Sequence, residues 1–216
     1  NTTASNNTAI GKDALLSNTS GTQNTAVGKG ALDANTTASN NSAFGYNALG
    51  SNTTGASNVA LGQFSLDANT TGGSNTALGH NALTGNTTAS NNTAVGKDAL
   101  GLNTTGTENV AVGANCLDAN TTGSYNIAVG RDSLGANTTG GTNTAYGSAA
   151  MPTNTSGAQN VAVGRLALRY NTTGSSNTGL GYLAGSSVTT GSGGIFIGQG
   201  SVPNNAADSY STVIGT

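Results

Sequence analysis

Side chains able to do acid–base, nucleophilic or metal chemistry are sparse in this chain of 216 residues, which has one histidine, one cysteine and eight carboxylates. The single cysteine, Cys116, excludes an intrachain disulfide. His80 is the only histidine, and no two carboxylates are placed as a general acid and a general base. The acids are also too sporadic for a calcium-binding roll, which needs an aspartate in every repeat. We therefore expect no enzymatic activity, no metal and no cofactor.

The charged residues reveal a strict spacing, because five of the six basic residues, beginning with Lys12 and Lys29, have numbers that differ by multiples of 17. Cutting the whole chain at this interval gives the consensus N-T-T-[GA]-x-x-N-[TV]-A-[VLI]-G-x-x-[AS]-L-x-x, and no insertion or deletion interrupts it. We call each repeat a coil and number its positions as columns 1 to 17. The coils begin at Asn1, Asn18, Asn35, Asn52, Asn69, Asn86, Asn103, Asn120, Asn137, Asn154, Asn171, Val188 and Asn205.

Such regular spacing predicts a repeat architecture in place of one or two ordinary domains. We expect a single continuous array over residues 1–216, about 12.7 coils long, in which the last coils, residues 188–216, are divergent. A flexible low-complexity linker, the other interpretation of an Asn/Thr/Gly/Ser-rich chain, would have no reason to keep its apolar residues in register.

Composition excludes several partners. Charged residues make up only 6% of the chain and the net charge is −2, so no basic surface for nucleic acid is present. No apolar run is long enough to insert into a membrane. The chain begins at Asn1 and not at a methionine, and we interpret it as a mature fragment or part of a longer extracellular fibre, on a cell surface or a virion.

Columns 7 to 11 read N-T-A-V-G, which is typical of a short strand between an asparagine and a glycine. Alternation along a strand places columns 8 and 10 on one face and columns 9 and 11 on the other. Column 10 is always apolar, whereas alanine at column 9 and glycine at column 11 leave the opposite face nearly bare. A bare strand face indicates that another element packs closely against it.

Column 15 is leucine in most coils, with Met151 as an exception, so columns 14 and 15 are predicted to form a second short strand or an extended wall. Columns 1 to 4 and 12 to 13 are predicted turns. Most charges and both prolines fall in columns 12, 13 and 16, which are therefore predicted to face solvent. His80 belongs to column 12 and Cys116 to the small-residue column 14.

The pattern predicts an all-β fold, a parallel β-solenoid with one 17-residue coil per repeat. Stacked coils advance by about 4.8 Å each, which gives a rod roughly 60 Å long. Identical residues then lie above one another, so the column 1 and column 7 asparagines can bond amide to amide, and the column 2 threonines can bond likewise along the stack. The N-x-[ST] sequences at column 1 of eleven coils are by-products of these ladders.

One chain offers little apolar burial to each coil. Each large side chain contributes about 1.5–3 kcal/mol when buried, whereas ordering the backbone costs about 1–2 kcal/mol for every residue of the coil. We therefore expect homo-oligomerisation about the rod axis, with the bare alanine/glycine face of one chain packed against another.

The N-[TV]-A-[VLI]-G core resembles the head repeats of trimeric autotransporter adhesins, which read approximately N-S-V-A-I-G, and the best matches are residues 109–113, 126–130 and 160–164. The longer form NTAVGKDALGLNTTG, residues 92–106, is similar to the shafts of phage tail fibres and related bacterial surface proteins. The resemblance covers essentially the whole chain and implies a left-handed parallel β-roll that assembles as a homotrimer. The family head repeat is usually shorter than the coil of this chain, and its valine at column 8 is often threonine here.

Two functions follow. The first is a structural or adhesive segment of a trimeric extracellular fibre, a phage tail fibre or a bacterial surface filament, which contacts host or environmental glycans or receptors. Outward tyrosines are candidate contacts, namely Tyr46, Tyr125, Tyr182 and Tyr210. The alternative is an ice-binding solenoid that uses the asparagine and threonine ladders, although the column 2 and column 3 threonines are adjacent and should point to opposite sides.

Overall fold

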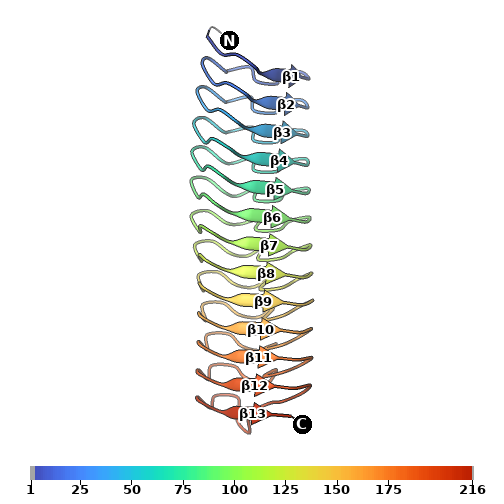
Figure 1. Cartoon of the computed structure of the whole chain (residues 1–216), viewed down its shortest axis with the longest axis vertical. Helices are drawn as coiled ribbons and strands as arrows, with labels where there is room; N and C mark the ends of the chain where they lie inside the picture. Colours follow the sequence, from blue (N-terminus) through green and yellow to red (C-terminus); the bar gives the residue numbers. More distant parts are fainter. Residues whose placement is uncertain (1–2, 216) are drawn as a thin grey trace. The chain divides into compact units, whose positions relative to one another are not determined.

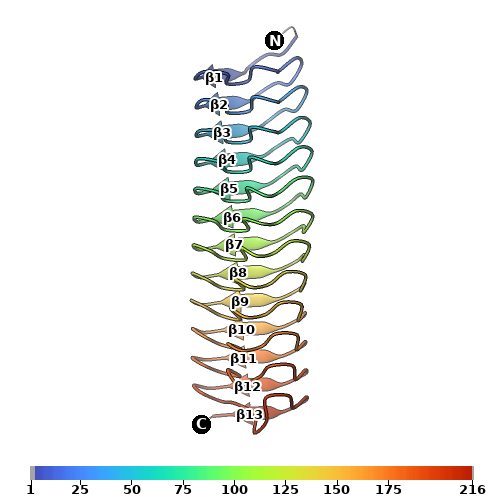
Figure 2. The ribbon, with the colours of Figure 1, turned by 180° about the vertical axis from the view of Figure 1, so that it is seen from behind.

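The structure of this chain is a computed structural model that describes residues 3–215. The chain divides into two compact units, Asn1–Glu108 and Asn109–Thr216. Within each unit successive coils stack as a parallel β-solenoid, and the described residues include no helix (Figure 1). The predicted fold class, an all-β parallel β-solenoid with one coil per repeat, is therefore confirmed. The segments that link successive strands are irregular in both views of the ribbon (Figures 1 and 2).

Among its described residues, unit 1 contains six strands of three residues, which occupy columns 8 to 10 as predicted. Each strand pairs in parallel with the next, and equivalent columns lie opposite one another, so that Ala26 is paired with Ala43 and Ala60 with Ala77. The strands are β1 (Thr8–Ile10), β2 (Thr25–Val27), β3 (Ser42–Phe44), β4 (Val59–Leu61), β5 (Thr76–Leu78) and β6 (Thr93–Val95).

Unit 2 repeats this arrangement with seven strands among its described residues. Its register is also strict, with Ala111 paired with Ala128 and Ile195 with Thr212. The strands are β7 (Val110–Val112), β8 (Ile127–Val129), β9 (Thr144–Tyr146), β10 (Val161–Val163), β11 (Thr178–Leu180), β12 (Ile195–Ile197) and β13 (Thr212–Ile214).

In the central coils of each unit the interior is made of columns 1, 4, 7, 9, 14 and 15. In unit 1, Ala60 and Leu66 are fully buried, and so is Asn58. The alanine face of the strands therefore points into its own solenoid, where it meets the leucine column. The expectation that this bare face packs against another chain is wrong, because the small alanine is what leaves room for leucine and asparagine inside so short a coil.

Columns 14 and 15 do not form the predicted second strand. They lie in a turn, and the column 15 leucines have left-handed backbones, with φ of 52° at Leu32 and 53° at Leu66. Leucine rarely adopts this conformation. Burial of the side chain and a backbone hydrogen bond from Leu66 N to the carbonyl of Ala82 (3.0 Å) hold it there. The side chains of columns 14 and 15 do pack as a continuous wall inside the coils, as predicted. The chain reverses direction too tightly there to form an extended strand.

Column 1 forms the predicted amide ladder. Asn52 Nδ2 donates to Asn35 Oδ1 (3.2 Å) and to the carbonyl of Gly55 in its own coil (2.9 Å). In unit 2, Asn137 Nδ2 donates to Asn120 Oδ1 (2.9 Å). Each of these amide-to-amide bonds runs from one coil to the oxygen of the preceding coil, so the ladder has a direction. A buried amide that bonds in this way avoids the cost of an unsatisfied polar group.

Column 7 uses its amides differently. The backbone N–H of Asn58 donates to Asn41 Oδ1 (2.9 Å), and Asn58 Nδ2 donates to the carbonyl of Gly72 (2.9 Å). Amide-to-amide bonds are added in unit 2, where Asn143 Nδ2 donates to Asn126 Oδ1 (3.1 Å). These asparagines therefore form hydrogen bonds with buried backbone groups of the neighbouring coils as well as with one another.

Column 2 forms the predicted bonds along the stack, but the acceptor is backbone. Thr53 Oγ1 donates to the carbonyl of Thr70 (3.0 Å), and Thr138 Oγ1 in unit 2 donates to the carbonyl of Thr155 (3.0 Å). The neighbouring column 3 carries the exposed threonines or serines. Only one of the two adjacent hydroxyl columns is therefore fully presented to solvent.

Column 11 requires glycine for two reasons. Gly62 has φ of 141°, a conformation that side chains rarely adopt, and a Cβ built on it would lie 2.6 Å from the carbonyl carbon of Gly79 in the next coil. The coils approach each other too closely here for any side chain.

One coil of unit 2 rearranges the interior around Phe196, which occupies column 9 of β12 and is fully buried. Glycine replaces the leucine of column 15 at Gly185 and the asparagine of column 7 at Gly194, and a Cβ on either would lie within 3 Å of the Phe196 ring. Both asparagine ladders end here. Val188 follows Asn171 in column 1, which explains why the buried Asn171 Oδ1 has no hydrogen-bond partner.

Candidate functional site

The surface feature that stands out is the outward side of the strands. We define the outer strand face of a unit as the first and third residues of its strands, columns 8 and 10. These side chains project away from the interior, because strand residues alternate between faces and the middle residue is buried. The face is built by the same three-residue strands that fix the register of the coils.

The outer strand face is uncharged, and it carries exposed large apolar side chains. In unit 1, Ile10 is 60% and Leu61 50% exposed, and in unit 2, Tyr146 is 59% and Leu180 47% exposed. Ten of the eighteen exposed large apolar residues in the described chain belong to columns 8 and 10. Neither column contains a charged residue in any coil. Column 10 therefore supplies a row of apolar side chains within each unit, beside a column 8 that is threonine or serine in most strands.

The face is not uniform along a unit. Column 8 is threonine or serine at several strands of unit 1, whereas β7, β8 and β10 of unit 2 begin with Val110, Ile127 and Val161. Column 10 varies in size as well, from valine to Phe44 in unit 1 and to Tyr146 in unit 2. Outside the rearranged interior around Phe196, the interior columns vary much less, so most of the variation lies in residues that do not pack inside the coil.

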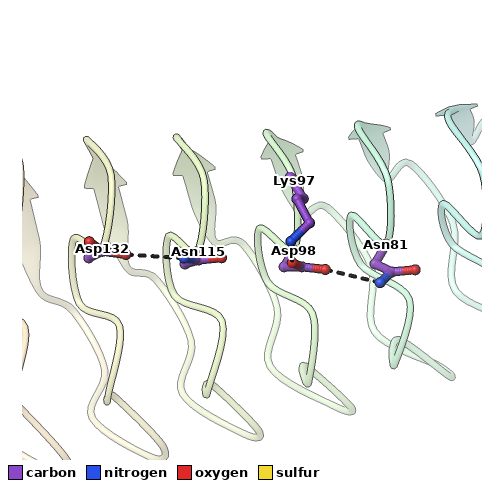
Figure 3. Close-up of polar contacts among 5 residues, drawn as sticks. All are labelled: Asn81, Lys97, Asp98, Asn115 and Asp132. Carbon is purple, nitrogen blue, oxygen red and sulfur yellow. Dashed lines mark hydrogen bonds and ion pairs between the residues drawn. The ribbon is translucent and has the colours of Figure 1, made fainter.

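Charged residues border this face at columns 12 and 13, just after each strand ends (Figure 3). In unit 1, Lys97 Nζ lies 2.9 Å from Asp98 Oδ2, and Asn81 Nδ2 donates to Asp98 Oδ1 (3.0 Å). The hydrogen bonds from Lys97 and Asn81 hold the pKa of Asp98 below its usual value, against a smaller upward effect of burial. In unit 2, Asn115 Nδ2 donates to Asp132 Oδ1 (3.2 Å) in the same arrangement.

Where column 13 is not an acid, the cation of column 12 meets a tyrosine of the next coil instead. In unit 1, Lys29 Nζ lies 5.6 Å from the ring centroid of Tyr46, which also contacts Phe64 edge to face at 5.2 Å. In unit 2, the Arg165 guanidinium lies 5.7 Å from the ring of Tyr182. Both tyrosines are 41% exposed, so each pair presents a cation and an aromatic ring together.

The two other candidate tyrosines lie on column 6. Tyr125 is 56% and Tyr210 84% exposed, and each has a left-handed backbone. They are five coils apart along unit 2, and Tyr182 lies on a different column. The structure therefore does not gather the predicted tyrosines into one site.

Cys116 and His80 occupy the predicted environments. Cys116 is fully buried in column 14, its Sγ lies 3.1 Å from the carbonyl oxygen of Ala128, and burial raises the pKa of its thiol to about 12. His80 is exposed in column 12, where solvent exposure was predicted.

Sequence reasoning missed the outer strand face, although a signal for it was present. Column 9 is nearly invariant alanine, which is what a stacked interior with no spare volume requires. Column 10 changes between valine, leucine, isoleucine, phenylalanine and tyrosine, which a packed ladder would not accommodate. Variation in size, and not smallness, therefore distinguishes the outside from the inside.

Among residues 3–215 there is no surface pocket and no cluster of three or more His, Cys, Asp or Glu suited to a metal ion. The same residues contain no helix with the length and apolarity needed to cross a membrane. Comparisons of the chain with protein-family models, curated proteins and solved structures give no match.

Proposed function

We propose that this chain is a non-enzymatic segment of an extracellular fibre, a phage tail fibre or a bacterial surface filament, in which three copies associate through the outer strand face. The observation that carries the proposal is the apolar column 10, which is at least partly exposed in every strand and is joined at some strands by valine or isoleucine at column 8, with no charge in either column. Apolar interface cores with polar rims are typical of homo-oligomers, and columns 12 and 13 supply the polar rim. The left-handed roll and the homotrimer implied by the sequence resemblance belong to this proposal.

The role of such an assembly is mechanical. Parallel in-register stacking gives backbone hydrogen bonds between coils at several columns, for example from Gly45 N to the carbonyl of Val27 (2.8 Å) and from Asn47 N to that of Lys29 (3.0 Å). A stack of coils held in this way resists bending within each unit, and association of three chains covers the apolar face that one chain leaves in water. The assembly then carries the parts of the fibre that attach to a host or another surface.

Light scattering coupled to size-exclusion chromatography tests the proposal. We expect a mass of three times 20.8 kDa. Leu61→Lys in unit 1 and Ile127→Lys in unit 2 introduce charges into the outer strand face and should each shift the mass toward 20.8 kDa. The matched control is Leu102→Lys, because Leu102 is 61% exposed but lies at column 17, off the face. A monomeric native chain, or equal dissociation by the control, would refute assembly through this face.

Glycan or receptor contacts are the adhesive part of the proposal. The Lys29–Tyr46 and Arg165–Tyr182 pairs support it, since each combines a cation with an exposed aromatic ring. Glycan-array binding by the native assembly should decrease after Tyr46→Ala and Tyr182→Ala. Unchanged binding in both variants would assign adhesion to another part of the fibre.

Ice binding is a second candidate, supported by the exposed hydroxyl at column 3 of successive coils, such as Thr54, Thr71 and Thr88 in unit 1. Against it, the adjacent column 2 hydroxyls donate to backbone and are only half exposed. Thermal hysteresis of the native chain, lost after Thr54→Val and Thr71→Val, would support it. Unimpeded growth of ice crystals would exclude it.

A further inference from the structure

The chain contains fourteen N-x-[ST] sequences, and the structure separates them into two groups. Eleven begin at column 1, where the described asparagines are at most 1% exposed. Their amide nitrogens are also engaged, as in Asn52, whose Nδ2 donates to Asn35 Oδ1 and to the Gly55 carbonyl. No enzyme can reach these nitrogens while the coil is folded.

The other three sequences begin at column 6, at the surface of the coil. Their asparagines, Asn6, Asn40 and Asn91, are exposed in the structure. The hydroxyl residue two positions later is the first residue of β1, β3 or β6 and therefore lies on the outer strand face of unit 1. Both groups that define the acceptor sequence, the amide and the hydroxyl, are thus presented on the outside of the folded chain.

The turns that carry Asn40 and Asn91 are each held in place by the preceding coil. Asn40 N donates to the carbonyl of Thr22 (3.1 Å), and Thr22 N donates to Ser39 Oγ (3.0 Å). The backbone of Asn40 is left-handed, with φ of 63°, which asparagine tolerates better than most residues.

Asn91 is held in the same way. Its N–H donates to the carbonyl of Gly73 (3.1 Å), and Gly73 N donates to Ser90 Oγ (3.0 Å). Both side chains therefore project from an ordered turn.

The three coils form a distinct subtype. They share the stretch N-T-T-A-S-N-N-[TS]-A, with alanine at column 4 and serine at column 5. In the coils whose column 8 is valine or isoleucine, column 6 is never asparagine. The acceptor asparagines are separated by two and then three coils, roughly 10 and 14 Å at about 4.8 Å per coil. This spacing leaves room for bulky groups that an acceptor in every coil would not.

We propose that Asn6, Asn40 and Asn91 are acceptor sites for N-linked glycosylation. The donor is a sugar carried on a diphosphate, either a nucleotide or a polyprenyl diphosphate. The amide Nδ2 forms a bond to C1 of the sugar and loses one proton, while the C1–oxygen bond to the diphosphate breaks and the diphosphate leaves with the electron pair. A glycan is bulky and solubilising, which suits the exposed surface of unit 1.

The test uses folded chain kept monomeric by Leu61→Lys and Ile127→Lys, a soluble asparagine glycosyltransferase and UDP-glucose, with glycopeptide mapping by mass spectrometry. We expect hexose on Asn6, Asn40 and Asn91 and none on column 1. In heat-denatured chain, the column 1 asparagines should become acceptors too. Ser42→Ala should abolish modification at Asn40, whereas the matched variant Thr54→Ala, which breaks a column 1 sequence, should leave the modification of folded chain unchanged.

Two results would overturn the proposal. One is modification of column 1 in folded chain to the same extent as column 6. The other is unmodified Asn40 and Asn91 while an unstructured acceptor peptide is modified in the same reaction. The proposed trimer would cover the column 8 hydroxyls, so the sugar is transferred to the folded single chain before assembly. Trimer formation is measured separately by mass, and either proposal can fail alone.

Discussion

The two sides of a single strand differ in both the size and the exposure of their side chains. In β3, Ala43 is fully buried while its neighbour Phe44 is 40% exposed, and in β9, Ala145 is fully buried while Tyr146 is 59% exposed. The inward residue is small and almost invariant, whereas the outward residue is large and variable. The comparison shows that the interior columns define the coil and that the outward columns are available for contacts with other molecules.

The largest contrast between inside and outside should appear in thiol reactivity. Burial raises the pKa of Cys116 from 9.0 to about 12, and a shift of that size reduces the thiolate at neutral pH about a thousand-fold. We expect a disulfide reagent to react with Cys116 only after the chain unfolds. An exposed thiol introduced as Thr54→Cys should react at once in folded chain, and equal rates for both would contradict the packing of column 14.

Truncation of the leucine column should cost the most stability. Leu66→Ala removes a fully buried side chain and should lower the free energy of unfolding by about 2–5 kcal/mol. The matched change on the outer strand face, Leu61→Ala, should cost less than about 1 kcal/mol in monomeric chain. Urea denaturation measures both, and similar losses would show that the inside and the outside have been assigned incorrectly.

The asparagine interior should be nearly as sensitive. Asn58→Ala leaves the Gly72 carbonyl and the Asn75 N–H without their side-chain partners, at a cost of about 1–3 kcal/mol for a buried unsatisfied group. Thr54→Ala, at the exposed column 3, should be neutral within about 0.5 kcal/mol. Thermal unfolding of the two variants compares them directly, and a neutral Asn58→Ala would mean that water replaces the amide.

The smallest effects should come from two surface carboxylates, Asp98 at column 13 and Asp67 at column 16, and they should depend on pH. The folded-state pKa of Asp98 is lowered by Lys97, so its stabilising contribution is present above the usual pKa of 3.8 and is lost as the pH falls through the lower folded-state value. Asp67, whose pKa is raised by burial, has the opposite sign and opposes folding at neutral pH. Asp98→Asn should therefore slightly destabilise the chain at pH 7 and Asp67→Asn slightly stabilise it, as pH-dependent urea melts would record.

The fold could be predicted from the sequence because one period, repeated without interruption, fixes the number and register of the coils. The strands at columns 8 to 10 and the amide ladder of column 1 followed from the same columns. The direction of the strand faces could not be obtained in this way. Alternation separates Ala43 from Phe44, but it does not say which of them points inward, and a small residue suits either a tight interior or a close external contact.

The left-handed leucines were not predictable for a related reason. Leu32 and Leu66 occupy a backbone conformation that local propensity disfavours, and only burial in the stacked coil makes it acceptable. The column 6 acceptor sequences also needed the structure, since the same motif at column 1 is buried. Sequence spacing identified which residues are equivalent, and three-dimensional packing decided which of them are accessible.

The uninterrupted repeat frame also bears on how such a chain can change its length. Removing a single residue would shift the columns of the coil that contains it out of line with those of its neighbours, whereas removing a whole coil leaves each remaining ladder continuous. Duplication or loss of whole coils therefore disturbs the packing least. The near-identity of residues 1–15 and 86–100 is what duplication of whole coils would produce. The coil is thus the unit of duplication as well as of structure. The number of coils in such a chain can therefore rise or fall by one at a time.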